Sequence, residues 1–334
     1  MAFQNIALKG YNRASHWQLV FQMEKLPLFV ANLEAALKLT NSPLSIVDYG
    51  CSEGFNSMQF FNKSLELLRK TSQRPVSILH TDLPKNNWTE FFNVLNNPHN
   101  NYLTKGNVTY SALGRSFYED ILLPESVHVG FSAFAFHYLS KEPIRKPGDT
   151  GIFHSAYVEQ GRQDMETLLN KRINELVPGG TLMIIVGART EQLNTKMGRL
   201  YFEPLSNLIK MGVISQEDFS AFGMTTYAFT LSEWQTLLKK LENKVKVIEL
   251  KMEKSICPFY LEYLKDKDIE VYKDELMKFV AQMMKVQVNT FINRTQEEKD
   301  KILEMLKTEI KNLIHSDPSE VYMEFTTLVL EKLK

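Results

Sequence analysis

The sequence predicts an α/β fold with a doubly wound, Rossmann-like sheet. Four apolar, β-rich runs alternate with helical patterns, as a parallel sheet with crossover helices requires. These runs are residues 45–49, 76–82, 127–133 and 181–188. The first run ends in a glycine turn that leads into a helical pattern, which is typical of a ligand site in such sheets. With 334 residues, 44% of them hydrophobic, the chain can bury a large core.

The predicted elements continue in order along the second half of the chain. The helix before the fourth run carries apolar residues at three- and four-residue spacing, from Met165 to Leu176. It is predicted to end at Pro178-Gly179-Gly180. Residues 244–250 alternate between apolar and polar side chains, which predicts a strand with one wet face. Residues 322–330 predict a terminal strand that returns to the sheet.

Two stretches interrupt this pattern and predict a helical cap built from insertions. From Arg189 to about residue 230 there are helical pieces without a central strand, and residues 267–314 form a charged helical region. We expect residues 1–30 to be an N-terminal lid segment of the core. The α/β core is expected to comprise residues 1–190, 244–254 and 316–334, and the cap over the site residues 191–243 and 255–315.

Composition favours a globular, cytoplasmic protein that acts on a small molecule. Lys plus Arg equals Asp plus Glu at 39 each, without a long basic run, so we expect no nucleic-acid partner. Two cysteines, Cys51 and Cys257, are too few for a disulfide framework, and the N-terminus shows no signal-peptide pattern, which indicates the cytoplasm. No apolar run approaches the roughly 20 residues that a membrane-spanning helix needs.

The histidines and serines do not form the common catalytic motifs. The seven histidines show no His-x-x-x-His pairing, and Cys-x-x-Cys is missing, so we expect no metal. Gly-x-Ser-x-Gly is also missing, and Cys51 is interpreted as a small turn residue rather than a nucleophile. These patterns disfavour metal-dependent and nucleophilic enzymes.

The glycine turn after the first strand predicts an adenosyl cofactor site. The strand stops at Asp48, and Gly50 and Gly54 let a ligand approach the backbone at the start of a helix. The carboxylate of Asp48 can accept hydrogen bonds from a cationic amino-acid group. The spacing differs from the dinucleotide Gly-x-Gly-x-x-Gly, which disfavours a dehydrogenase. A glycine turn in any α/β domain is the alternative interpretation.

Two further segments extend this site toward a nucleoside. Asp82 ends the second strand, where its carboxylate can accept hydrogen bonds from both ribose hydroxyls. The alternative for Asp82 is a helix cap, because Leu83-Pro84 follows it. In the later turn, the hydroxyl of Ser116 can meet an adenine edge, and the ring of Phe117 can cover the adenine face.

Several ordered motifs give the chain a resemblance to one family. They are Asp48-x-Gly-Cys-Ser-x-Gly-x-Asn56, residues 82–88 (Asp-Leu-Pro-Lys-Asn-Asn-Trp), Ser116-Phe117-Tyr118, residues 131–140 (Phe-Ser-Ala-Phe-Ala-Phe-His-Tyr-Leu-Ser) and residues 175–180 (Glu-Leu-Val-Pro-Gly-Gly). In this order they resemble the SABATH family of S-adenosylmethionine-dependent methyltransferases. That family methylates carboxyl groups of salicylate, benzoate, jasmonate and related acids and, in one branch, xanthine nitrogens. The resemblance begins at residues 10–18 and spans nearly the whole chain.

The resemblance implies a class I methyltransferase sheet, S-adenosylmethionine as the cofactor and a homodimer. The positions that match cofactor contacts are Asp48, Asn56, Asp82, Leu83, Ser116 and Phe117, with Ser15 close to the cofactor. Substrate contacts match Gln18, Phe134, His137 and Tyr138, and Tyr11 helps to close the site. The family has Tyr at the position of Phe134 and Trp at that of Tyr138, so the acid itself does not follow from the resemblance.

Methyl transfer to a carboxylate requires no general base, because a carboxylic acid with a pKa of roughly 4 is already ionised near neutral pH. Gln18 and Tyr138 are the candidates to donate hydrogen bonds to that carboxylate. His137 either donates to it as well or packs with the neighbouring aromatic rings. The aromatic residues expected to exclude water are Trp17, Phe131, Phe134 and Phe136, of which Phe131 and Phe136 are expected in the core.

Two other functions remain open from the sequence. One is an N-methyltransferase that acts on a small neutral heterocycle, and the other is a protein that binds S-adenosylmethionine without catalysis. A substrate panel separates the first from carboxyl methylation, and cofactor binding without turnover indicates the second.

Overall fold

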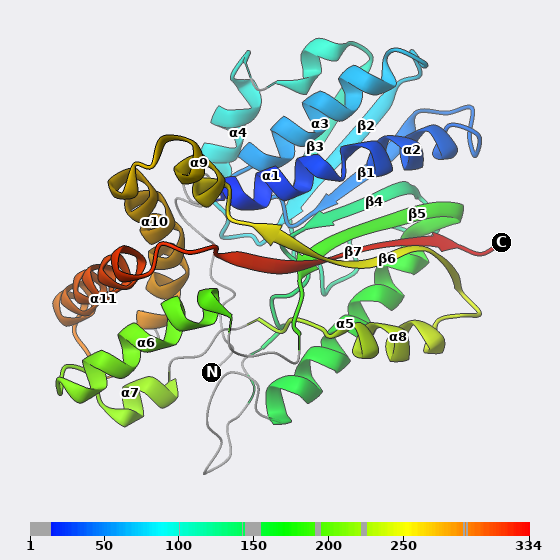
Figure 1. The fold of residues 1–334 in the computed structure, drawn as a ribbon. Helices are drawn as coiled ribbons and strands as arrows, with labels where there is room; N and C mark the ends of the chain where they lie inside the picture. The colour runs from blue at the N-terminus through cyan, green and yellow to red at the C-terminus, as the bar shows by residue number, and fades with distance from the viewer. Residues whose placement is uncertain are drawn as a thin grey trace.

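The computed structural model describes residues 15–99, 101–141, 143, 155–190, 195–221, 226–289, 291 and 293–334. Within these residues the chain forms one seven-stranded sheet in the order β3-β2-β1-β4-β5-β7-β6 (Figure 1). The strands are β1 (Leu44–Tyr49), β2 (Val76–Asp82), β3 (Val108–Gly114), β4 (Val127–Ala133), β5 (Leu176–Gly187), β6 (Val245–Ile256) and β7 (Tyr322–Lys332). The predicted doubly wound α/β sheet is confirmed.

The sheet is mixed because its two last strands run against the others. Strands β1 to β5 pair in parallel, whereas β7 is antiparallel to both β5 and β6. All four predicted central strands are present, and both predicted late strands form β6 and β7. Strand β3 was missed because it lies at the sheet edge, and none of its seven residues is fully buried. Without a buried face it lacks the apolar run that marks a central parallel strand.

The helices fall into two layers and a cap. They are α1 (His16–Glu24), α2 (Leu26–Ala36), α3 (Phe55–Leu68), α4 (Trp88–Asn96), the short 3₁₀ helix η2 (Tyr102–Lys105), α5 (Ser155–Glu175), α6 (Lys196–Lys210), α7 (Gln216–Ala221), α8 (Leu231–Lys240), α9 (Pro258–Asp266), α10 (Ile269–Val288) and α11 (Gln296–Ser316). Helices α1 to α4 lie on one side of the sheet, and α5 and α8 lie on the other (Figure 1).

Alternating strand residues feed two separate cores. Ile46 packs in the core beneath α2 and α3, whereas its neighbour Val47 packs in the core that includes α5 and α8. This follows from the period of two in a strand, which sends successive side chains to opposite faces. Helix α8 begins with a capping box between Thr230 and Glu233 and turns Trp234, fully buried, toward the second core. The predicted segment 191–243 therefore ends with a helix that covers the sheet.

The end of α5 differs from its predicted position. The helix stops at Glu175, and Leu176 already pairs with Val127 as the first residue of β5. The register shifts between Val127 and Val129, so the Pro-Gly-Gly sequence lies inside an irregular strand rather than after a helix. Proline and glycine are tolerated in strands at such irregular positions.

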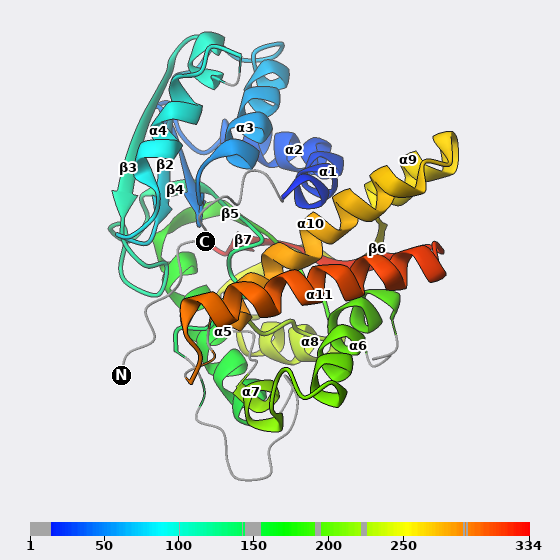
Figure 2. The same ribbon diagram turned by 90° about the vertical axis from the view of Figure 1, so that its left-hand side faces the viewer.

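Helices α6, α7, α9, α10 and α11 gather beyond the carboxyl ends of the parallel strands (Figures 1 and 2). Helices α10 and α11 lie side by side, and α6 packs against α11. Their buried residues join the same core as α1 to α3, which fixes these helices against the sheet edge where the predicted site lies. Within the described residues no helix is long and apolar enough to cross a membrane.

Candidate active site

The turn after β1 requires glycine for two reasons. Gly50 has φ +86°, and a Cβ added to it would lie 2.2 Å from the Cβ of Ala135. The Gly50 and Cys51 amides donate to the carbonyl of Thr81 at 2.8 and 3.0 Å, which ties the turn to the end of β2. The turn therefore lies directly against the segment that follows β4.

The second glycine of the turn sets the start of α3. Gly54 has φ +89° and occupies the N-cap position of that helix. A Cβ at this position would lie 2.8 Å from the ring of Phe91. The first turn of α3 is thus brought to the edge of the sheet beside β1, as the glycine pattern predicts.

Two carboxylates lie at the ends of the adjacent strands β1 and β2. Asp48 is 2% exposed, and its Oδ2 lies 2.8 Å from Nδ1 of His80. Asp82 accepts hydrogen bonds from the amides of Ser52 and Leu83, both at 2.7 Å. The helix-cap interpretation of Asp82 does not hold, because the side chain of Asn87 caps α4.

Burial controls the protonation of Asp82. Loss of solvent raises the pKa of this carboxyl to about 6, although its two backbone hydrogen bonds oppose the rise. The nearby Asp48 raises this pKa slightly further. Asp82 is therefore ionised at neutral pH but takes up a proton in mildly acidic solution.

The N-terminal helix reaches the first turn of α3 through one polar pair. The hydroxyl of Ser15 donates to Oδ1 of Asn56 at 3.3 Å, and Nδ2 of Asn56 donates to the Ser15 carbonyl at 3.2 Å. Ser15 is completely buried. These two predicted cofactor residues are separated by 41 positions in sequence, yet they contact each other. Tyr11 lies outside the described residues.

A buried arginine holds the loop that carries Ser116 and Phe117. Arg172 on α5 donates to the carbonyls of Phe117 and Glu119 at 3.0 and 2.9 Å, and forms an ion pair with Glu175 at 2.8 Å. The Phe117 ring would lie 3.8 Å from a Cβ on Gly50, so the loop borders the glycine turn. Sequence reasoning missed Arg172, whose only local signal is an arginine on the buried face of α5.

The segment after β4 turns sharply as it enters the site. Phe134 has φ +57°, an unusual value for an aromatic residue, and its amide donates to the Ile185 carbonyl at 2.7 Å. Its ring packs edge-on against Phe325 of β7, with the ring centres 5.1 Å apart. Phe131 and Phe136 are buried in the two cores, as predicted.

His137 and Tyr138 lie next to each other, and burial shifts the pKa of both side chains. Burial lowers the pKa of His137 to about 4, so its ring is neutral near pH 7, and its buried Nδ1 has no hydrogen-bond partner among the described residues. Burial, and secondarily the carboxylate of Asp82, raises the pKa of Tyr138 to about 12. Tyr138 therefore keeps its hydroxyl proton and can donate a hydrogen bond.

Helix α1 carries Gln18, and the neighbouring residue Trp17 anchors this helix. Within the described part of the chain, the buried Oε1 of Gln18 has no hydrogen-bond partner. Trp17 is fully buried, donates from Nε1 to the hydroxyl of Ser255 at 3.0 Å, and packs on Phe279. The expectation that Trp17 helps to exclude water from an apolar substrate stays a prediction, and in the structure this ring fastens α1 to β6 and α10.

Residues 8–332 match the sequence model of a family described as SAM dependent carboxyl methyltransferase. The chain belongs to this family. It is therefore an S-adenosylmethionine-dependent carboxyl O-methyltransferase of small acids, which confirms the predicted enzyme class and cofactor. The predicted family resemblance is confirmed as well.

Individual relatives are also named as methyltransferases. The chain is 26% identical over 354 residues to methyltransferase FUS9 of Gibberella moniliformis, with 98% of each chain covered. It is 26% identical to paraxanthine methyltransferase 2 of Arabidopsis thaliana over 70% of this chain and 73% of that protein. The fold matches a solved structure of loganic acid methyltransferase with SAH at a TM-score of 0.77 and 20% identity, covering 100% and 99% of the two chains. The carboxyl methyltransferase thus has the class I methyltransferase fold.

The residues at the strand ends fit S-adenosylmethionine in this carboxyl methyltransferase. The cofactor carries a cationic amino group and a ribose diol, both of which need acceptors. Asp48 and Asp82 offer carboxylates side by side, and no hydrogen bond between described residues reaches Oδ1 of Asp48. The partnerless Oε1 of Gln18 and Nδ1 of His137 likewise point to a ligand that completes the site.

The prediction that this methyltransferase needs no metal stays a prediction. Among the described residues, Asp48, Cys51 and His80 place possible ligand atoms within 4.8 Å of one another. However, Nδ1 of His80 already contacts Asp48, and its Nε2 contacts the hydroxyl of Tyr102 at 2.9 Å. Both ring nitrogens are thus used in hydrogen bonds.

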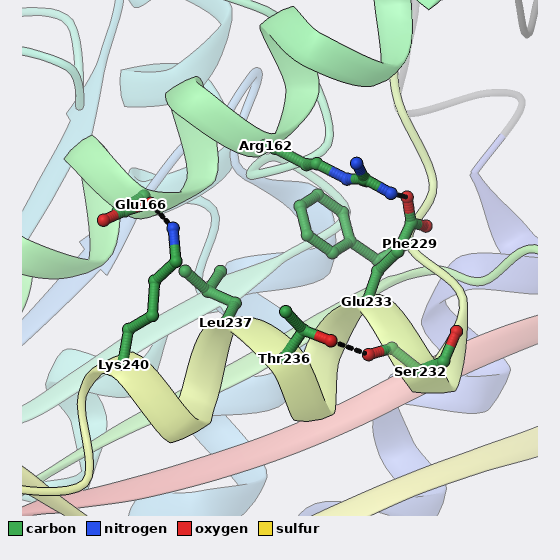
Figure 3. Close-up of a pocket in the computed structure, with 8 residues that line it drawn as sticks. All are labelled: Arg162, Glu166, Phe229, Ser232, Glu233, Thr236, Leu237 and Lys240. Carbon is green, nitrogen blue, oxygen red and sulfur yellow. Dashed lines mark hydrogen bonds and ion pairs between the residues drawn. The ribbon is translucent and has the colours of Figure 1, made fainter.

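A pocket of about 300 Å³ lies elsewhere on the methyltransferase, between α5 and α8 (Figure 3). Phe229 and Leu237 line its apolar part. Its charged groups pair across the two helices: Arg162 with Glu233 at 3.0 Å, and Lys240 with Glu166 at 2.6 Å. None of the predicted site residues lines this pocket.

Proposed function

We propose that the enzyme transfers the methyl group to a small, largely apolar acid held against the segment after β4. The contact between Gly50 and Ala135 supports this most directly, because a cofactor on the glycine turn then borders the segment that carries Phe134, His137 and Tyr138. The cofactor-binding residues in this proposal are Ser15, Asp48, Gly50, Asn56, Asp82, Leu83, Ser116 and Phe117.

Each of these residues has a distinct role in the proposal. Asp48 accepts from the cationic amino group, and Asp82 accepts from the ribose hydroxyls. Gly50 has no side chain, so the cofactor can approach its backbone. The Ser15–Asn56 pair closes the site from the N-terminal side. The Phe117 ring covers the adenine, with Ser116 and Leu83 at its edge.

Gln18, His137 and Tyr138 bind the acid by its carboxylate. The amide of Gln18 and the hydroxyl of Tyr138 donate hydrogen bonds that orient one oxygen toward the cofactor. A neutral imidazole keeps one N–H, so His137 can donate a third hydrogen bond without titrating near pH 7. Phe134 lines the chamber, and Tyr11 closes it.

S-adenosylmethionine supplies an electrophilic methyl group on its sulfonium sulfur. The chain contributes orientation and exclusion of water rather than proton transfer, because the carboxylate nucleophile is already ionised. Holding two reactants in reactive geometry is worth up to about 7–11 kcal/mol in favourable intramolecular cases. The Gln18 and Tyr138 clamp is the part of the site that provides this orientation.

A helical lid covers the chamber in this proposal, made of the N-terminal segment 1–30 and the cap. Two observations support it. Burial first, and the nearby Tyr138 to a lesser extent, raises the pKa of Tyr201 on α6, which is consistent with α6 lying near the acceptor side. The hydroxyl of Tyr201 donates a hydrogen bond to Gln287 of α10. Both residues are buried, so a polar pair lies in the contact between the cap helices α6 and α10.

A second candidate is methylation of a ring nitrogen in a neutral heterocycle. The relative named paraxanthine methyltransferase 2 favours it. The partnerless Oε1 of Gln18 and Nδ1 of His137 are both able to accept a hydrogen bond from an N–H group. We rank it second because a clamp of donors suits a carboxylate better.

Incubation with a labelled methyl donor and a panel of acids and xanthines tests the proposal. We expect a base-labile methyl ester of an aromatic, indolic or isoprenoid acid, identified by mass spectrometry. Base-stable label on a xanthine would establish the second candidate instead. Tight binding of S-adenosylhomocysteine without turnover on any compound would indicate a binding protein without catalysis and contradict the proposal.

We also propose that the enzyme is a cytoplasmic homodimer. The family resemblance supports the dimer, and both cysteines are buried and free of disulfides, as in a reducing compartment. Light scattering after size exclusion is expected to give twice the mass of one chain. A monomer mass at micromolar concentration would contradict the dimer.

A further inference from the structure

Three buried side chains form a hydrogen-bonded chain behind the glycine turn. The hydroxyl of Tyr102 lies 2.9 Å from Nε2 of His80, and Nδ1 of His80 lies 2.8 Å from Oδ2 of Asp48. Tyr102 and His80 are 0% exposed and Asp48 is 2% exposed. The three residues come from η2, β2 and β1. Their hydrogen bonds therefore link the edge of the α/β core to the proposed cofactor site.

When Asp48 is ionised and the His80 imidazole is neutral, only one direction is possible for these hydrogen bonds. An ionised carboxylate only accepts, so Nδ1 of His80 carries the proton that it shares with Asp48. In a neutral imidazole Nε2 is then an acceptor, and it accepts a hydrogen bond from the hydroxyl of Tyr102. Burial raises the pKa of Tyr102 well above its usual value, so this hydroxyl keeps its proton and can donate.

Aromatic packing holds the imidazole in place. The rings of Phe61 and Phe91 meet the His80 ring edge-on, with centres 5.7 and 5.2 Å away. An imidazole fixed in this way leaves the carboxylate of Asp48 little freedom to rotate. Its Oδ2 is occupied by His80, and no hydrogen bond between described residues reaches Oδ1.

We propose that His80 is a positioning residue that holds Asp48 with one oxygen aimed at the amino group of the bound cofactor. Tyr102 fixes the tautomer of His80 in this arrangement. The inference rests on the proposed role of Asp48 and deepens it. Burying a polar ring in an aromatic cluster costs free energy unless its hydrogen bonds are made. We therefore assign the His80 ring a role beyond packing.

Two ligands separate this role from a general contribution to the fold. S-adenosylhomocysteine carries the amino-acid group, whereas 5′-methylthioadenosine is the corresponding nucleoside thioether without it. In calorimetry, His80→Phe is expected to weaken S-adenosylhomocysteine binding by about tenfold or more, the scale of one hydrogen bond to a charged group. The affinity for 5′-methylthioadenosine is expected to stay within a factor of about two, because the lost contact lies at the absent group.

Matched variants sharpen the experiment. His80→Asn keeps a donor near the Nδ1 position and is expected to restore most of the affinity for S-adenosylhomocysteine. Tyr102→Phe removes only the hydroxyl and is expected to have a smaller effect of the same selectivity. Asp82→Ala serves as the contrast, because both ligands carry the ribose that it is proposed to bind, and it is expected to weaken both.

The possible outcomes decide between the claims. Unchanged S-adenosylhomocysteine affinity in His80→Phe, or an equal loss for both ligands, would overturn the positioning role while leaving the cofactor assignment in place. Failure of the unaltered protein to bind either ligand would overturn the proposed site and this inference together. A selective loss that His80→Asn repairs would support it.

Discussion

On the proposed cofactor side, the carboxylates of Asp48 and Asp82 are each held by a hydrogen bond from the chain itself, whereas on the proposed acceptor side two buried polar atoms have no partner among the described residues. At the ends of β1 and β2, Asp82 accepts two backbone amides and Asp48 is held by His80. On the acceptor side, Oε1 of Gln18 and Nδ1 of His137 have no partner within the described residues. Buried polar atoms in folded proteins are normally bonded, so we expect a ligand to complete the proposed acceptor side.

This difference shows how one enzyme can keep its cofactor and vary its substrate. The cofactor turn is over-determined by glycine geometry, strand pairing and the Arg172 anchor, so small changes there disturb the fold. In the proposed site, the acceptor side is lined by single side chains on α1 and on the segment after β4. We expect substitutions there to alter binding of the acid without the same cost in the free energy of unfolding.

The largest effect is expected from breaking the anchor of the Phe117 loop. Arg172→Met leaves Glu175 buried without its ion-pair partner and should lower the free energy of unfolding by about 3–5 kcal/mol, measured by denaturant titration. Arg162→Met on the same helix is the control, because its pair with Glu233 is exposed on the arginine side. That control should cost less than about 1 kcal/mol. An equal loss of unfolding free energy in the two variants would contradict the difference expected between the buried and the exposed arginine.

A next-largest effect is expected at the glycine turn. Gly50→Ala combines a positive φ with a contact of 2.2 Å to Ala135. Backbone strain and overpacking together should cost about 2–4 kcal/mol and weaken S-adenosylhomocysteine binding. Gly212→Ala isolates the strain, because Gly212 has φ +72° with nothing within 4 Å of an added Cβ. If both variants lose the same stability, the close approach of Ala135 contributes nothing.

On the acceptor side, substitution should change turnover and spare the cofactor. Gln18→Ala is expected to lower kcat/KM for the acid about 10–100-fold, the worth of one hydrogen bond to a charged group. Affinity for S-adenosylhomocysteine should change little. Gln18→Glu places a negative charge beside the substrate carboxylate and should reduce activity further. A fully active Gln18→Ala enzyme would remove this residue from the clamp.

The smallest effect is a pH dependence of cofactor binding. The raised pKa of Asp82, about 6, means that this carboxyl gains a proton as the pH falls through that value. The ribose hydroxyls bind the ionised form better, so S-adenosylhomocysteine affinity should fall by at most about tenfold per pH unit below that point. Calorimetry at pH 7.5, 6.5 and 5.5 measures this fall, and Asp82→Asn should flatten it. A constant affinity in the unaltered protein would exclude the role of Asp82.

Local pattern predicted most of the core but failed where burial was incomplete. Strands β1, β2, β4 and β5 were predicted because buried parallel strands read as apolar runs. Strand β3 was missed because its side chains are partly or fully exposed to solvent, so its sequence shows no apolar run. The anchoring role of Trp17 was missed for another reason: its hydrogen bond to Ser255 joins residues 238 positions apart, and a local pattern does not record such a contact.

The sequence by itself determined the α/β class, the glycine turn and the order of the family motifs. These features depend on residues that are close in sequence: apolar runs predict buried strands, and glycine marks the positions where the backbone needs a positive φ. Only the tertiary structure decided that His80 contacts Asp48 and that Arg172 holds the loop of Phe117. His80 meets Asp48 across 32 positions, and Arg172 meets Phe117 across 55. Such contacts leave no local pattern in the chain, because they arise only when strand pairing and helix packing bring distant segments together.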